Sequence, residues 1–288
     1  MRKLLVSLAL SALTLVTLPA ASLGAAAITS FKAKAVPIPK PGGGVFAHTG
    51  NCLGCGAAVE AEYTLSGSGY GVTAQNPNGG IPPISQVNFY LPTGARLHPQ
   101  GFSACSEATL KNFGPSACPH RSVASPRGSV LGEVTFGNER VPETAELRAF
   151  FARGGGLLFY TAGHSPVSLE IVSSGHFVNT HRRPYGLELV TPVPAVPTVP
   201  GAPLASVRRI KVKVGAAIRR GRRIVSYGYM PKKCPRGGFP VKTEVTFGGS
   251  FGPGREFGIP AETRMATYRA PCPRRHAHGA RAHRARRR

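Results

Sequence analysis

The sequence predicts a mainly β protein with sandwich-like antiparallel sheets, one short helix and disulfide staples. The chain of 288 residues contains 36 Gly and 27 Pro, and both residues interrupt helix interiors. Short segments that alternate apolar and polar residues are separated by turn residues, which is typical of half-buried strands. Six cysteines follow an export-like N-terminus, and exported proteins commonly form disulfide bonds.

Residues 1–27 have the pattern of a secretory signal peptide. Arg2 and Lys3 precede an apolar stretch from Leu4 to Leu18 that is too short to span a bilayer comfortably. The small residues Ala25, Ala26 and Ala27 then offer a cleavage pattern. We expect a secreted protein, extracellular or associated with the cell surface. A retained anchor helix is the alternative, and no later segment predicts a membrane span.

The rest of the chain divides by composition. Residues 28–58 are a Pro/Gly-rich spacer with a C-x-x-C motif, and 59–192 form a β-rich domain. Residues 193–203 are a proline-rich linker, 204–272 a smaller β module, and 273–288 a disordered basic tail. Strands are expected at 59–67, 84–92, 128–136, 145–151, 156–162, 167–173 and 185–192, and four more after the linker. In the first strand, Val59, Ala61, Tyr63 and Leu65 share the apolar side.

One segment predicts the short helix. Ser106 is a helix N-cap, Glu107 and Lys111 suit the first and last turns, and Gly114 is a stop signal. The preceding Leu91–Gly94, LPTG, only resembles a wall-sorting signal. It lies mid-chain and lacks the intervening residue, so it predicts a strand end and a turn.

The cysteines predict three disulfide bonds. Cys105 pairs with Cys118 around the short helix, and Cys234 pairs with Cys272 around the last strands. Cys52 and Cys55 favour a tight local bond. A redox motif or a zinc half-site that recruits His48 remain open alternatives for that pair.

The charge is strongly basic, with a formal net charge of +24. Without Arg2, Lys3 and the tail arginines, 27 basic residues face 12 acidic ones. The expected partners are anionic cell-wall polymers or lipid head groups, with no specific nucleic acid. The candidate polyanion-binding residues are the tail arginines Arg274, Arg275, Arg281, Arg284, Arg286, Arg287 and Arg288.

No catalytic site, cofactor or metal is predicted. All 12 acidic residues are Glu, so mechanisms that require Asp are excluded. Glu60 and Glu62 form a carboxylate pair on one side of a strand, which more simply predicts a solvated face. The segment from Thr161 to Val167, TAGHSPV, lacks the second glycine of a nucleophile elbow and predicts a turn.

Several phrases give the chain a wider resemblance. They are LPTGARLHPQGFSACSEATL (residues 91–110), GPSACPHRSV (114–123), IKVKVGAAIRRGRRIVSYGYMPKKCPRGGF (210–239) and VTFGGSFG (245–252). With them the chain resembles a group of secreted actinobacterial proteins of uncharacterised function. The resemblance implies secretion and a β-rich fold, and it carries no catalytic residues.

Two functions follow as expectations. The first is a non-enzymatic binding or structural protein outside the cell, with weak affinity for polyanions. The alternative is a secreted hydrolase that uses Glu and His, whose site would gather His with Ser or Glu in one pocket.

Overall fold

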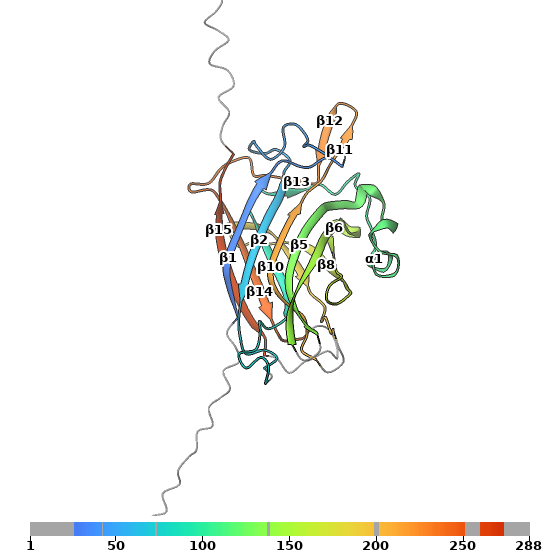
Figure 1. The fold of residues 1–288 in the computed structure, drawn as a ribbon. Helices are drawn as coiled ribbons and strands as arrows, with labels where there is room; N and C mark the ends of the chain where they lie inside the picture. The colour runs from blue at the N-terminus through green and yellow to red at the C-terminus, as the bar shows by residue number, and fades with distance from the viewer. Residues whose placement is uncertain are drawn as a thin grey trace, which may run out of the picture.

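A computed structural model describes residues 26–41, 43–72, 74–136, 139–198, 202–250 and 260–273. Over these ranges the chain is mainly antiparallel β-structure with one α-helix and three disulfide bonds (Figure 1). The predicted fold class is therefore confirmed. The expected signal peptide, apart from Ala26 and Ala27, and almost all of the tail lie outside the described residues.

Eleven of the described strands form a single sheet in which all neighbours are antiparallel. In spatial order they are β1 (Ala27–Val36), β2 (Ala58–Ser66), β10 (Ser206–Val214), β5 (Val123–Phe136), β6 (Glu139–Phe151), β7 (Leu157–Gly163), β8 (Leu169–Asn179), β9 (Tyr185–Pro192), β3 (Ile84–Pro92), β14 (Phe239–Phe247) and β15 (Glu262–Ala270). Two small ladders pair β11 (Ala217–Arg220) with β12 (Arg223–Ser226) and β4 (Arg96–Leu97) with β13 (Gly228–Tyr229).

The sheet curls until its two edge strands, β1 and β15, lie side by side (Figure 1). Ten antiparallel pairings separate them, so β1 and β15 run in the same direction. Polar contacts join the two edges at one end: the Ala26 N–H donates to Glu262 Oε2 at 3.3 Å, and Arg264 Nε donates to the Ala26 carbonyl at 2.8 Å. The sheet is thus nearly closed, with an inner face that forms the core.

Strands from both sides of the proline-rich segment belong to this sheet. β10 lies between β2 and β5, and β14 pairs with β3. The boundary expected at residues 193–203 therefore does not divide the sheet. β1 lies mostly in the expected spacer at 28–58, where Phe31 and Ala33 are buried while Lys32 and Lys34 are exposed.

A charged ladder covers the outer face of β1, β2 and β10. Glu60 accepts from Lys34 on one side at 3.1 Å and from Lys213 on the other at 3.2 Å. Burial alone would raise the pKa of Glu60, but these two lysines together lower it below its usual value. Glu62 forms an ion pair with Arg209 of β10. The predicted carboxylate pair is thus a structural element of the outer face.

A second apolar layer covers the outside of β6, β7 and β8. It is supplied by residues 105–118, which contain α1 (Glu107–Phe113) beside β8 (Figure 1). The Ser106 hydroxyl accepts from the Thr109 N–H at 3.0 Å, and Gly114 ends the helix, as predicted. Leu110 is fully buried against Phe150 and Leu158. The Cys105–Cys118 bond closes the segment over these strands.

Candidate functional site

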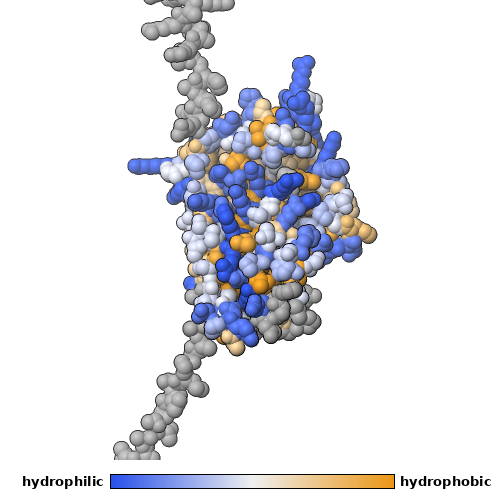
Figure 2. Space-filling view, viewed as in Figure 1, coloured by the Kyte–Doolittle hydropathy of each residue, from blue (hydrophilic) through white to orange (hydrophobic). Residues whose placement is uncertain are grey.

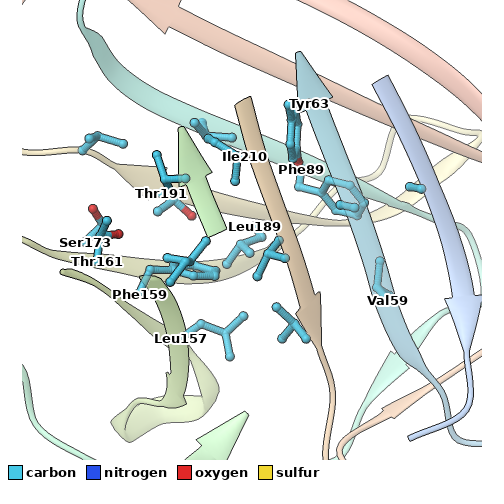
Figure 3. Close-up of a pocket in the computed structure, with 18 of the residues that line it drawn as sticks. Val59, Tyr63, Phe89, Leu157, Phe159, Thr161, Ser173, Leu189, Thr191 and Ile210 are labelled. Carbon is cyan, nitrogen blue, oxygen red and sulfur yellow. The ribbon is translucent and has the colours of Figure 1, made fainter. Parts of the chain in front are cut away.

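The inner face of the sheet surrounds a cavity of about 300 Å³. Its walls come from strands on all sides of the curled sheet, and most of the lining is apolar (Figure 3). Arg96 and Met230 lie at one end of the lining, while Pro83 and Pro194 lie at the other. This volume is within the range of small-molecule sites, about 300–1,000 Å³.

The cavity exists because small residues occupy inward-facing positions. Ala61 on β2, Gly132 on β5 and Ala145 on β6 all line it. In an antiparallel pair, residues directly opposite share one face of the sheet, and Gly132 lies opposite Glu143 while Ala145 lies opposite Gly163. The Ala145–Gly163 pair therefore leaves β6 and β7 without bulk at one level, and Gly132 leaves room beside Glu143. Larger side chains such as Tyr63 and Phe89 pack together farther along the interior.

An aromatic cluster packs at the end of the cavity near β13. The rings of Phe151 and Tyr227 stack with centroids 4.1 Å apart, and Phe102 meets both edge to face. The Tyr227 hydroxyl donates to the Gly155 carbonyl, and burial raises the pKa of Tyr227 to about 12. Tyr227 therefore stays neutral and fixed by a hydrogen bond at physiological pH.

One buried carboxyl group lies in the lining. Glu143 is only 3% exposed. Its Oε1 accepts from the Ser165 N–H at 3.3 Å, and its Oε2 accepts from the Val167 N–H at 3.2 Å. Both donors belong to the turn between β7 and β8, within the segment TAGHSPV. That segment is a turn, as predicted, and its backbone holds Glu143 in place.

A second, polar hollow lies on the outer face, near the start of β6. Glu133, Arg140 and Arg208 line it, and Arg208 forms an ion pair with Glu133 at 2.5 Å. Glu133 Oε2 and Arg140 Nε are buried without a hydrogen bond in the described part of the chain. None of the histidines in the described ranges lines this hollow or the cavity. Neither place gathers His with Ser or Glu.

Exposed basic residues concentrate at one end of the molecule. The β11–β12 hairpin projects there, and blue side chains mark it in Figure 2. The exposed basic residues of the hairpin and of the following loop are Arg219, Arg220, Arg222, Arg223, Lys232, Lys233 and Arg236. Within the described residues, none of these seven forms an ion pair with an acidic side chain. We call this set the basic end.

All six predicted cysteines form the expected bonds: Cys52–Cys55, Cys105–Cys118 and Cys234–Cys272. The local bond occupies both thiols of the C-x-x-C motif. In the ranges that the structure describes, no three or more His, Cys or Glu side chains gather as metal ligands. The candidate arginines of the tail, from Arg274 to Arg288, lie outside the described residues.

The chain matches no known family: no family profile, no curated protein and no solved structure shows significant similarity. Over the described residues, no helix has the length and apolar character needed to cross a membrane.

Sequence reasoning missed the cavity and the basic end. Val207, Ile210, Val212 and Val214, the apolar residues of the first strand after the proline-rich segment, line the cavity. Glu143 precedes the segment predicted as a strand. It continues the alternation of Ala145 and Leu147, which was the available signal of an inward-facing carboxyl. The hairpin was visible as RRGRR, four arginines around Gly221.

Proposed function

We propose that this is a secreted, non-enzymatic binding protein that holds a small apolar molecule inside its curled sheet. The observation that carries the proposal is the cavity of about 300 Å³ with a mostly apolar lining. Apolar space of this size is unfavourable when empty, because the lining loses contacts on one side. Three disulfide bonds suit an oxidising, extracellular setting.

Filling the cavity tests this proposal. We expect phenylnaphthylamine, a neutral apolar dye, to bind with a rise in fluorescence. Ala145→Phe should weaken binding by at least about tenfold, because an added ring occupies the volume of a benzene, roughly half the cavity. Thr144→Phe is the matched control, since Thr144 is exposed on the outer face of the same strand.

A reporter inside the cavity locates the dye. The chain contains no Trp, so Phe159→Trp, at a lining position, introduces a single indole. Its fluorescence should fall as the dye binds. Equal dye binding by the Ala145→Phe and Thr144→Phe variants would contradict the proposal. Turnover of a p-nitrophenyl ester above the buffer rate would instead support the alternative, a Glu/His-dependent hydrolase.

We also propose that the basic end, together with the basic tail, contacts phosphate-bearing anions such as wall polymers or lipid head groups. The supporting observation is that β15 ends at Ala270 and is followed by Cys272, which is bonded to Cys234 between the basic residues Lys233 and Arg236. The tail thus leaves the fold at the basic end. The two positive segments then act on one surface.

The hairpin arginines test this contact. The Arg222→Gln/Arg223→Gln variant should bind phosphatidylglycerol vesicles about 30-fold more weakly at low salt, at about 1 kcal/mol per basic residue. The charge-matched control is Lys34→Gln/Lys213→Gln, whose lysines already pair with Glu60. Soluble polyphosphate forms the second arm and separates polymer binding from lipid binding. Equal losses in the two variants would show that only net charge matters.

A further inference from the structure

The cavity wall built by β6, β7, β8 and β9 carries four polar side chains: Glu143, Thr161, Ser173 and Thr191. We call this set the polar wall. Figure 3 shows Thr161, Ser173 and Thr191 gathered at one side of the cavity, with Tyr63 and Phe89 at the other. The lining thus has a large apolar part and a polar patch on this wall, while Lys34, Arg96 and Ser206 line it elsewhere. A ligand that fills the cavity therefore needs a large apolar part and one polar group.

The hydroxyls of the polar wall have unused hydrogen-bonding capacity. Ser173 is 8% exposed and Thr191 is 7% exposed. No hydrogen bond joins either hydroxyl, or that of Thr161, to another group in the part of the chain that the structure describes. All three residues line the cavity, and a hydroxyl can both donate and accept a hydrogen bond. A polar group of a ligand would supply the missing partner.

Glu143 sets the kind of polar group. A carboxylate has about four acceptor sites, and the two backbone N–H groups of the β7–β8 turn occupy one on each oxygen. No Lys, Arg or His of the described ranges forms an ion pair with it. Both oxygens of Glu143 thus act as acceptors. Their remaining lone pairs favour a head group that donates a hydrogen bond, which a carboxylate cannot do.

Two glycines make room for these groups. A Cβ on Gly163 would lie 2.5 Å from Glu143 Oε1, and a Cβ on Gly175 would lie 2.8 Å from Thr191 Oγ1. Any larger residue at these positions would displace the polar atoms. The absence of a side chain at Gly163 and Gly175 thus leaves space for the oxygen atoms of Glu143 and Thr191.

We infer that the cavity takes an apolar molecule with one hydrogen-bond-donating head, a hydroxyl or an amino group, which the polar wall holds. An apolar cavity of about 150 Å³ holds benzene, and this one is about 300 Å³. The apolar body therefore has roughly twelve carbons on the same scale. This inference rests on the proposed function, since it names the ligand class of the same cavity.

Competition against phenylnaphthylamine tests the head group. The competitors are dodecanol, dodecylamine and dodecanoate, which share one chain length. They are used at neutral pH, below the solubility limit of dodecanol and below the critical micelle concentrations of the other two. Dodecanol and dodecylamine should displace the dye at a concentration about tenfold lower than dodecanoate, because their head groups donate hydrogen bonds and a carboxylate has no hydrogen to donate. Thermal unfolding should follow the same order, since ligands that bind the native state raise Tm.

Two variants assign the effect to the polar wall. Glu143→Gln should remove most of the discrimination against dodecanoate. Ser173→Ala/Thr191→Val should weaken dodecanol about tenfold relative to the dye, because it removes hydrogen bonds to the dodecanol hydroxyl. Ser174→Ala, an exposed neighbour on β8, is the control. If Glu143→Gln fails to fold, Ser173→Ala/Thr191→Val still tests the role of the polar wall.

The outcomes separate this inference from the proposed function. Dye binding with equal displacement by all three competitors overturns the head-group assignment and leaves the binding function intact. Discrimination that persists unchanged in both variants also overturns it. Absence of dye binding, together with no Tm shift for any competitor, overturns both proposals.

Discussion

Removing the Cys234–Cys272 bond by replacing both residues with alanine is expected to lower the free energy of unfolding by roughly 4 kcal/mol. The bond joins residues that are 38 positions apart, and the loop it closes contains β14 and β15. Cross-linking a long loop restricts the unfolded chain, so the loss grows with loop length. Urea unfolding of the oxidised protein, followed by far-UV circular dichroism, measures it.

The control is the Cys52→Ala/Cys55→Ala variant. Its bond spans a separation of only 3 residues, and the same chain-entropy argument gives a loss of about 2 kcal/mol. Equal losses in the two variants would show that loop closure is not the source of the stabilisation. The cysteines of both bonds lie toward the end of the molecule where β15 finishes. The two variants therefore differ in loop length and not in the region of the fold that they change.

The second large effect is expected for Phe150→Ala, at about 3–5 kcal/mol. Phe150 is 2% exposed and packs with Leu110, Leu158 and Cys105 in the layer outside the sheet. Truncation leaves a cavity between α1 and the strands beneath it. Phe113→Ala, in the helix that packs over Phe150, is the control, because Phe113 is 71% exposed and its change should stay within about 0.5 kcal/mol.

Phe150→Ala also separates stability from binding. Phe150 points away from the cavity, which is lined from β6 by Ala145 and Leu147. Under conditions where the variant remains folded, its affinity for phenylnaphthylamine should equal that of the unchanged protein. A parallel loss of dye binding would mean that the outer layer shapes the inner wall.

Local patterns were enough to predict most of the strands. β3 and β9 have the bounds expected from sequence, and Ala61, Tyr63 and Leu65 are buried as their alternation indicated. These signals depend on residues two apart and on turn residues at the ends. The short helix was predicted for the same reason, since its cap and its stop are adjacent in sequence.

The closure and the cavity depend on residues that are far apart in the chain. β10 enters the sheet between β2 and β5, and nothing within its own sequence specifies those partners. The interior space arises because Ala61, Gly132 and Ala145 face one interior, although each alone is an ordinary small residue. β1 was missed because its buried positions include Ala33 and its surroundings are rich in Pro and Gly.

The parallel run of β1 and β15 has a geometric consequence for attachment. Because the two edge strands point the same way, residue 26 lies at one pole of the sheet and residue 273 at the other (Figure 1). A strand of 9 residues spans about 30 Å at roughly 3.3 Å per residue. A tether before Ala26 and a tether after Cys272 would therefore hold the molecule in opposite orientations, with the basic end facing outward in the first case and toward the support in the second.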